Sequence, residues 1–511
     1  MSASPSAIAS VGQLTVEIDG APLAPSDAVC LSGLRVRHAL SLPAQCELAF
    51  HGIGPELADR APDLMGASLK VAGDDGTAFE GEITAVEQNY GPDGSKELRL
   101  RGYDLLHRLR KRQTVKFRDD VDAGELCRQF AADLGLSSDI SEAGPRWPRL
   151  AQWQQTDFEV LAGVAARAGL YFAVADQTLR LFTLAGWGGE PITITLGDEL
   201  LEASFEANGD GSWSEVVAAG WDPSTGKLFD GTVGSARSGR SLRVPASTAD
   251  VGGAPRRSVV NLPLPDGSHV TASAQAELDR AAANALTVRA VAAGRPDLRV
   301  GGKVVLEGVH AKLSGTYVVS EVVHTVTAER GFVTEFSSAV PGAGTAMSFA
   351  TAVIAQGVVS QVDDPDSQGR VSVKLPGYQD IETGWMRVLL PAAGQDKGFI
   401  ALPDEGDQVL VLLPNGDPAL GVVLGGLYGT DGVPDTGISG GRVKRHCWRS
   451  PQGHYVEIDD EKDQITVTNA NGSTLQLGKN KFTINAATDL DITASGKSIA
   501  ITAAAVDFRN G

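Results

Sequence analysis

The sequence predicts a mainly β protein with small helical insertions, and three observations support this fold class. The chain of 511 residues contains 60 glycines but only 6% aromatic residues, a balance that favours many turns and short strands over a helical bundle. Many short runs alternate apolar and polar residues, which is the period of a strand with one buried face. Near the C-terminus such runs recur about every eight residues, as in stacked short strands joined by turns.

Length and charge restrict the possible functions. A chain of this length exceeds one ordinary core and predicts roughly three domains. Its net charge of −19 would repel nucleic acid and anionic lipid, so we expect no nucleic-acid partner. The four cysteines Cys30, Cys46, Cys127 and Cys447 have no CxxC spacing, which argues against a zinc site or a disulfide framework. We therefore expect reduced thiols, no metal and no cofactor.

The N-terminal residues give no targeting signal. Residues 1–14 lack a basic segment followed by an apolar core, and the sequence contains no run of about 18 apolar residues. We therefore expect no signal peptide, no membrane-spanning helix and assembly in the cytoplasm. A role outside the cell would require another device to carry the protein there.

The first part of the chain has the pattern of an antiparallel sheet. Leu14, Val16 and Ile18 lie two residues apart, and alternation continues to residue 50. Residues 79–86 and residues 98–104 alternate in the same way and are separated by a turn-rich segment. They predict a β-hairpin.

Helices are expected in the middle of the chain. Residues 123–134 follow Asp122, a good N-cap, and residues 158–168 follow a Thr-Asp pair. Both runs end at glycine. Residues 170–182 then predict a returning hairpin. Further on, the alanine-rich residues 272–291 predict one long helix that packs its small face on a sheet.

Residues 357–428 predict a small barrel, preceded by a flexible linker at residues 341–345. Turn-forming Asp, Asn, Gly and Pro clusters separate its short apolar runs. Among the turn residues are Gly369, Gly406 and Gly416, and a positive φ is expected at Gly416. The expected strands are residues 371–375, 385–390, 409–413 and 421–424.

One strand of this barrel has a clear inward face. Val371, Val373 and Leu375 alternate with Ser372 and Lys374. We expect the three apolar residues to fill the interior and the two polar residues to face water. Closure of the sheet would also remove exposed strand edges.

The C-terminal repeat predicts assembly with other copies of the chain. Each repeat supplies one short strand and one polar turn, and a thin chain of this kind cannot bury its apolar face alone. A three-chain, intertwined β-prism meets that requirement. The apolar residues predicted to form its core are Val456, Ile458, Ile465, Val467, Leu475, Leu477, Phe482, Ile484, Leu490, Ile492, Ile499, Ile501, Val506 and Phe508.

Charged clusters allow competing interpretations. Arg108, Arg110, Lys111 and Arg112 could form a nucleic-acid patch, but the acidic background argues against it. A solvated or interface-facing edge is the alternative, and of these uses we favour ion pairing across a subunit interface. His324 lies on an expected strand with no nucleophile motif nearby, so a structural hydrogen bond is favoured over catalysis.

A second cluster raises the question of metal binding. His454, Glu457, Asp459 and Asp460 could be proposed as metal ligands. Glu457 and Asp459 alternate with the apolar repeat residues, however, so we expect them to face outward and solubilise a narrow rod. The sequence therefore favours solubilising carboxylates over a metal site.

Several motifs resemble the VgrG and phage tail hub-and-needle family. Within residues 357–428 the order G-R-V-S-V, W-M-R-V, P-D-E-G-D-Q-V-L-V, N-G-D-P and G-G-L-Y resembles the OB-fold barrel of VgrG and tail-needle proteins. F-E-G-E-I-T, L-R-L-R-G-Y-D-L-L-H-R-L and W-Q-Q-T-D-F-E-V-L-A-G-V resemble the hub of the late control D and VgrG families. The sequence is thus similar to the spike of a contractile injection system.

This resemblance implies a three-part architecture. Residues 1–345 would form two hub β-barrels with a helical lobe at about residues 120–170, by analogy with the family's hub. Residues 346–432 would form the OB-fold barrel. Residues 433–511 would form the triple-stranded β-helical needle.

It also implies a function and partners. The spike would be a homotrimer that caps the inner tube ring, adapts three-fold to six-fold symmetry, contacts baseplate components and pierces the target envelope on sheath contraction. Cargo in the tube is a further candidate partner. Because the last strand lacks metal ligands, we expect a separate PAAR-type tip protein at Val506, Phe508 and Arg509.

Other classes of function and of particle stay open. The spike could belong to a phage tail, a type VI secretion apparatus or a particle released from the cell, and it could be ejected into a target. Alternative functions are a cell-wall-degrading needle enzyme and a trimeric fibre adhesin. We find no nucleophile elbow, HExxH or Walker loop, so we expect no enzymatic activity.

Overall fold

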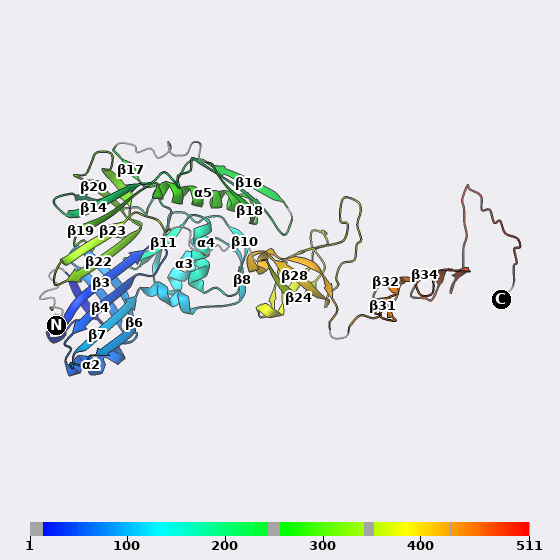
Figure 1. Cartoon of the computed structure of the whole chain (residues 1–511), viewed down its shortest axis with the longest axis horizontal. Helices are drawn as coiled ribbons and strands as arrows, with labels where there is room; N and C mark the ends of the chain where they lie inside the picture. The colour runs from blue at the N-terminus through cyan, green and yellow to red at the C-terminus, as the bar shows by residue number, and fades with distance from the viewer. Residues whose placement is uncertain (1–13, 226, 244–255, 342–351, 430–431, 510–511) are drawn as a thin grey trace. The chain divides into compact units, whose positions relative to one another are not determined.

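The computed structural model describes residues 14–225, 227–243, 256–341, 352–429 and 432–509, apart from the side chain of Asn261. The chain forms two compact units, divided between Leu427 and Tyr428. Figure 1 colours them from blue to red along the chain. The expected linker at residues 341–345 and the boundary at 345/346 lie almost wholly outside the described residues. The described part is mainly β, as the sequence predicts.

An eleven-stranded sheet organises the first unit, in the order β14-β19-β23-β22-β3-β4-β7-β6-β5-β1-β2. Its β3–β7 half curls around a core that includes Leu31, Leu48, Phe50 and Leu98, and β6 and β7 pair as the predicted hairpin. The elements of this first half-barrel are β1 Leu14–Ile18, β2 Ala21–Pro22, α1 Pro25–Ala28, β3 Leu31–Ala39, β4 Gln45–His51, α2 Pro55–Arg60, η1 Ala61–Leu64, β5 Ser68–Gly73, β6 Gly76–Tyr90 and β7 Lys96–Tyr103.

The same sheet continues into a second half-barrel through antiparallel pairing of β3 with β22. Arg37 Nε and Glu321 Oε1, 2.6 Å apart, join the two strands. A separate sheet in the order β13-β20-β21-β17 covers a core around Phe182, Leu306 and Tyr317. The elements are β13 Ile192–Thr195, β14 Leu200–Ala207, β17 Ser241–Leu242, β19 Leu286–Ala293, β20 Lys303–Glu307, β21 Gly315–Val318, β22 Glu321–Thr327 and β23 Gly331–Ser337.

A mixed lobe with the main helices lies in the same unit. The predicted N-caps are in place: Asp122 Oδ1 accepts a hydrogen bond from Glu125 N at 2.8 Å, and Thr156 forms a capping box with Glu159. Its core also takes in the later strands and α5, which runs along β16 (Figure 1). The elements are η2 Leu105–Lys111, β8 Lys116–Val121, α3 Ala123–Asp133, β9 Ser137–Ile140, β10 Trp147–Gln152, α4 Asp157–Arg167, β11 Tyr171–Ala175, β12 Thr178–Phe182, β15 Glu215–Trp221, β16 Leu228–Val233, β18 Arg256–Pro263 and α5 Gly267–Asn284.

The expected long helix at residues 272–291 is wrong in its last turns. Helix α5 begins earlier, at Gly267, because the Asp266 carboxylate accepts hydrogen bonds from Ser268 N and His269 N. It ends at Asn284, and strand β19 begins at Leu286. From there Leu286 and Val288 alternate into the core, and β-branched residues favour the strand. The alanines before residue 286 favour a helix, so the sequence did not indicate the change from the helical period to the alternation of a strand.

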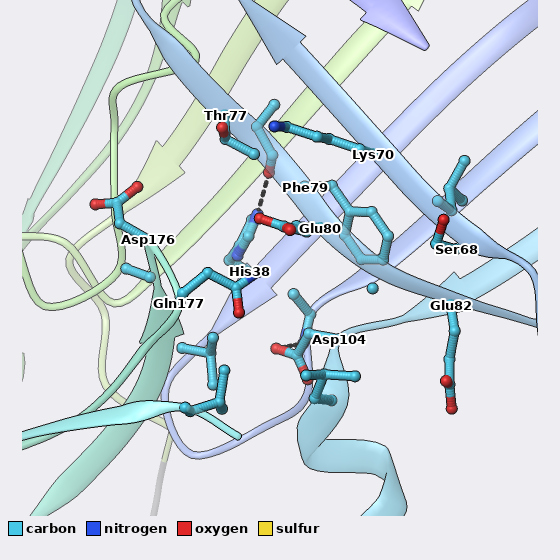
Figure 2. A pocket seen from close by; sticks show the side chains of 18 of the residues that line it. His38, Ser68, Lys70, Thr77, Phe79, Glu80, Glu82, Asp104, Asp176 and Gln177 are labelled. Atoms are coloured by element: carbon cyan, nitrogen blue, oxygen red, sulfur yellow. Dashed lines mark hydrogen bonds between the residues drawn. The ribbon is translucent and has the colours of Figure 1, made fainter. Parts of the chain in front are cut away.

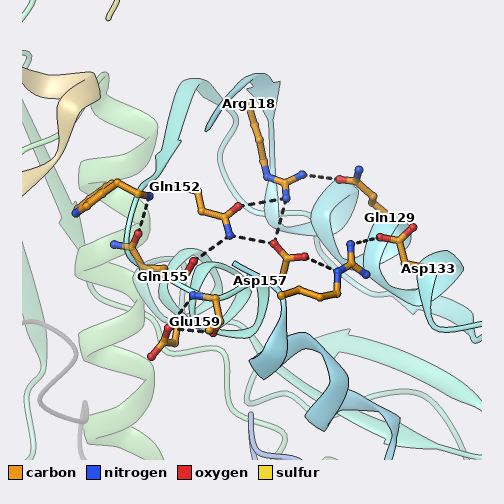
Figure 3. Close-up of polar contacts among 10 residues, drawn as sticks. Arg118, Gln129, Asp133, Gln152, Gln155, Asp157 and Glu159 are labelled. Atoms are coloured by element: carbon orange, nitrogen blue, oxygen red, sulfur yellow. Dashed lines mark hydrogen bonds and ion pairs between the residues drawn. The ribbon is translucent and has the colours of Figure 1, made fainter. Parts of the chain in front are cut away.

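A buried carboxylate holds the lobe together (Figure 3). Asp157, at the start of α4, is only 3% exposed. Its Oδ2 lies 2.9 Å from Arg112 Nε, and its Oδ1 lies 3.5 Å from Arg118 Nη2 and accepts a hydrogen bond from Gln152 Nε2 at 3.0 Å. Arg112 also pairs with Asp133. The network links η2, β8, β10, α3 and α4.

The last part of the first unit is a small barrel-like sheet, which we call the collar. Its strand order is β26-β25-β24-β28-β29-β27. Val371, Val373 and Leu375 are buried as expected, but Ser372 is buried too, because its hydroxyl donates a hydrogen bond to Thr383 O at 2.9 Å. The collar elements are β24 Val353–Gln361, β25 Ser372–Leu375, η4 Pro376–Tyr378, β26 Ile381–Glu382, β27 Arg387–Val388, β28 Gln408–Leu413, η5 Pro414–Gly416, η6 Pro418–Leu420 and β29 Val422–Leu427.

No helix among the described residues is both long enough and apolar enough to cross a membrane. All four cysteines are free thiols. Burial raises the pKa of the Cys127 thiol to about 12 and also raises that of Cys46. These two thiols therefore behave as apolar core groups.

Candidate functional site

The C-terminal unit is built around a five-stranded antiparallel meander. Tight turns join consecutive strands, so neighbours in sequence are neighbours in the sheet. A short ribbon of β30 Ile438–Ser439 and β31 Arg442–Val443 precedes it. The meander consists of β32 Arg445–Arg449, β33 Tyr455–Asp459, β34 Gln464–Thr468, β35 Thr474–Gly478 and β36 Phe482–Asn485.

The register of this meander places the predicted repeat residues directly opposite one another. Ile458 lies opposite Ile465, which lies opposite Leu477, which lies opposite Phe482. A second row joins Val456, Val467, Leu475 and Ile484 in the same way. Because side chains alternate between the two sides of a strand, both rows lie on one face. We call these eight residues the apolar face.

Within the described part of one chain, most of the apolar face is exposed. Phe482 is 57% exposed and Ile484 is 52% exposed, and Ile458, Ile465 and Leu477 are exposed as well. The opposite face carries polar residues, including Thr466 and Gln476, which pair across the sheet. A contiguous apolar surface rimmed by polar groups marks an interaction site.

The sequence analysis did not single out Trp448, which adjoins the apolar face. Trp448 on β32 lies opposite Val456, so its side chain extends the apolar rows by one strand. It precedes Val456 by about the eight-residue spacing of the repeat. That spacing was the available signal.

The remaining predicted core residues lie beyond the meander. Residues 486–509 form no strand in the described chain, and their apolar side chains are exposed. Phe508, one of the predicted tip contacts, is 92% exposed. Arg509 Nη2 lies 3.4 Å from Asp507 Oδ2. The exposed residues of this segment are Leu490, Ile492, Ile499, Ile501, Val506 and Phe508.

The expectation that Asp459 faces water is wrong. Asp459 is buried, and its Oδ1 accepts hydrogen bonds from Glu461 N and Lys462 N, both at 3.0 Å. Lys462 Nζ lies 3.0 Å from Asp459 Oδ2. These bonds lower the pKa of the carboxyl and order the turn between β33 and β34. Among the described residues, no group of three or more His, Cys, Asp or Glu is placed to hold a metal ion.

An ion pair fixes the start of the meander. Arg445 donates two hydrogen bonds to the Asp435 carboxylate, from Nη2 at 2.7 Å and from Nε at 2.9 Å. These bonds lower the pKa of Asp435 to about 2. The bidentate geometry is the strong form of an arginine–carboxylate pair.

The collar carries a second exposed apolar surface. Residues 389–403 form a loop, and a bridge between Gly394 and Lys397 holds its tip. In this loop Leu389 is 61% exposed and Ile400 is 74% exposed. Leu402 is also exposed. We call this segment the collar arm. Sequence reasoning missed it because the arm contains no regular period.

The three turn glycines of the collar all have positive φ. The values are 70° at Gly369, 89° at Gly406 and 71° at Gly416. A Cβ added at Gly416 would meet only Val353 Cγ2, at 3.5 Å. Glycine is therefore favoured at position 416 by its positive φ and not by a lack of space for a side chain.

We predict that Gly416→Val loosens the collar. A non-glycine residue at this φ costs about 1–2 kcal/mol, and a β-branched residue lies at the upper end. Backbone amides of β24 and β28 should then exchange hydrogen roughly 5–30 times faster. Hydrogen–deuterium exchange of the full chain measures this, with Asn415→Gly, at φ 55°, as the control that should not accelerate exchange. Unchanged exchange in Gly416→Val would contradict the prediction.

The basic segment that follows β7 pairs within the chain. Arg108 Nη2 lies 2.5 Å from Glu82 Oε2, Arg112 contacts Asp157, and the Arg110 guanidinium lies 5.0 Å from the Phe158 ring centre. Ion pairing of this segment across a subunit interface stays a prediction, since Arg108, Arg110 and Arg112 already have partners within one chain. Their partners are the lobe and the first half-barrel.

His324 is a buried structural residue. Its Nδ1 lies 3.0 Å from Thr334 Oγ1, and its ring contacts His38 edge-on at 6.1 Å. Burial lowers its pKa well below the ordinary value, and His38 and Arg299 act in the same direction. Burial likewise lowers the pKa of His38 to about 4, although its hydrogen bond to Ala78 O opposes this.

These two histidines predict a loss of hub stability in acid. The folded state holds them neutral, whereas the unfolded chain binds protons below pH 6.5, so stability falls as the pH falls from 6.5 towards 4. Thermal unfolding of the full chain across this range measures the loss. His324→Gln should make the decline shallower than in the unmodified protein. An equally steep decline in the variant would contradict this cause.

Comparison with known proteins places this architecture in a family. A family model described as the Alg8 N-terminal domain matches residues 71–328, half of the chain. The chain belongs to the Alg8 N-terminal domain family. A second model, described as the type VI secretion system/phage-baseplate injector OB domain, matches residues 355–428, which form the collar. A search of curated proteins found no match.

Solved structures of similar fold come from injection and tail particles. A chain of the Francisella PdpA–VgrG complex, half-lidded, has a TM-score of 0.52 at 8% identity, covering 92% of this chain and 87% of that one. The E. coli c3393 protein, a type VI secretion component, has a TM-score of 0.48 at 12% identity, with 81% and 99% covered. The 43 kDa tail protein of prophage MuSo2 from Shewanella oneidensis has a TM-score of 0.49 at 12% identity, with 64% and 97% covered. The fold is that of a VgrG-like spike.

Proposed function

We propose that this chain is the trimeric hub-and-needle spike of a phage tail-like contractile injection system. The observation that carries the proposal is the exposed apolar face on a needle-like repeat, joined to an injector OB domain. In the proposed assembly, three copies bury their apolar faces against one another. Full burial of one such side chain contributes about 1.5–3 kcal/mol.

In the proposed trimer, segments before and after the meander would also contact the neighbouring copies. Residues 486–509 leave their apolar pairs unpaired within one chain, so they would form strands only with neighbouring copies. The collar arm would pack on the adjacent collar, because exposed Leu389 and Ile400 have no other cover among the described residues. The three collars would then pack against one another and hold the three chains together.

The hub would cap the inner tube. Each chain contributes two half-barrels joined through β3 and β22, so three chains offer six related positions to a six-fold tube ring. Baseplate components would surround this hub, and cargo would lie in the tube behind it. On sheath contraction the spike would be driven outward and would pierce the target envelope.

A separate PAAR-type tip protein would complete the needle at Val506, Phe508 and Arg509. The first two side chains are exposed apolar groups, which a cap would cover. The proposal assigns the chain a mechanical role and no catalytic step.

Assembly on the tube tests the proposed function. Purified chain mixed with the particle's inner-tube protein should cap tubes at one end, as seen by negative-stain electron microscopy. Failure to associate with tube ends would contradict the hub role. Incubation with peptidoglycan tests the enzymatic alternative, and reproducible cleavage would overturn the mechanical assignment.

A further inference from the structure

A cleft of about 430 Å³ lies where the first half-barrel meets the lobe (Figure 2). Strands β1, β5 and β6 form one wall, and the turn between β11 and β12, with Asp176 and Gln177, forms the opposite wall. Arg299 also lines the cleft. A cavity of this size accommodates a short peptide or a small ligand.

One wall of the cleft is an open strand edge. Strand β6 pairs with β5 from Gly76 to Glu82, but it pairs with β7 only from Glu82 onward. Residues 76–81 therefore have a strand on one side only. Open edges of this kind are templates for pairing with another chain.

The direction of the backbone groups follows from the hydrogen bonds of Ile83. Ile83 N donates to Ala67 O at 2.9 Å and Ile83 O accepts from Gly66 N at 2.8 Å, so both groups point towards β5. Successive residues of a strand point their backbone groups in opposite directions. The N–H and C=O of Glu80, three residues earlier, therefore point to the open side.

One acceptor on this edge is already used. Ala78 O lies 2.8 Å from His38 Nε2, so the imidazole ends the edge on that side (Figure 2). Glu80 remains as the position where an incoming strand can exchange two backbone hydrogen bonds. The slot is consequently short, about three residues.

The rim of the slot has an excess of negative charge. Lys70 lies between Glu17 and Glu80 across the sheet, opposite both. Among the described residues these three form no ion pair, whereas Glu82 pairs with Arg108 and Asp176 pairs with Arg299. Two carboxylates thus flank one ammonium group without pairing with it. A cation beside Glu80 would balance them.

We propose that this cleft is a docking slot for a short extended peptide segment of a partner protein that carries a lysine or arginine at its centre. The central residue would lie directly opposite Glu80 and exchange two backbone hydrogen bonds with it. In antiparallel pairing, directly opposed side chains share one face of the sheet. The cationic side chain would therefore lie beside the Glu80 carboxylate.

Capped tripeptides titrated into the full chain test this slot, with binding followed by calorimetry and ligand-observed NMR. The tripeptide Val-Lys-Val should bind at least about tenfold more tightly than Val-Glu-Val. Methylation of the backbone amide nitrogen of the central lysine should abolish binding, because it removes the N–H that donates one of the two backbone hydrogen bonds. This comparison uses the unmodified protein and does not depend on the folding of any variant.

Charge reversal on the protein gives the second arm of the test. Glu80→Lys should reverse the preference so that Val-Glu-Val binds more tightly. Glu87→Lys is the matched control, since Glu87 lies on the same strand where β7 already pairs with it, and it should leave the preference unchanged. The proposal is overturned if Val-Lys-Val does not bind at millimolar concentration, if the N-methylated peptide binds equally well, or if both variants act alike.

Discussion

Replacing Leu477 with aspartate is expected to abolish the assembly of copies while leaving the hub and collar folded. Leu477 lies at the centre of the apolar face, between Ile465 and Phe482. In a trimer the substitution places three carboxylates in an apolar interior, and each uncompensated buried charge costs several kcal/mol. Analytical ultracentrifugation should show the variant as a monomer at micromolar concentration.

The adjacent residue provides the matched control. Gln476 lies on the same strand but on the opposite, polar face, where it pairs with Thr466 and Thr483. Gln476→Asp adds the same charge one residue away and should assemble like the unmodified chain. Retained assembly in Leu477→Asp, or equal loss in both variants, would show that the apolar face does not face the partner chains.

Asp157→Asn is expected to destabilise the lobe by about 3–5 kcal/mol, the cost of removing one partner of a buried ion pair. The amide keeps the shape of the carboxylate but leaves Arg118, whose side chain is only 10% exposed, without its counter-charge (Figure 3). Thermal unfolding should show an earlier transition, and proteolysis should cut first within the lobe.

Substitution of Asp133 tests whether burial causes the large destabilisation expected for Asp157→Asn. It pairs with the same Arg112 at 2.7 Å, but the Asp133 side chain is 38% exposed. Asp133→Asn should therefore cost no more than about 1 kcal/mol, as for other surface pairs. Similar losses in the two variants would contradict the account of the network.

Local chemistry made much of the fold predictable. The hairpin of β6 and β7 follows from alternation around a turn, and α3 and α4 begin where Asp122 and Thr156 supply caps. The rows of the apolar face follow from the spacing of Val456, Ile458 and their repeats. In each case the signal lies within a few residues of the element.

The errors arose where distant contacts decide the outcome. Pairing with β14 and β23 makes a strand of β19, although the alanines before it favour a helix. Ser372 and Asp459 are buried because each finds hydrogen-bond partners that alternation alone does not reveal. The open edge of β6 is visible only once the end of β7 is known.

We expect three chains to assemble around the apolar face. Native mass spectrometry of the full chain measures this assembly. The spectrum should show a species of three times the 53.2 kDa chain mass at micromolar concentration. A species of the single-chain mass under the same conditions would contradict it.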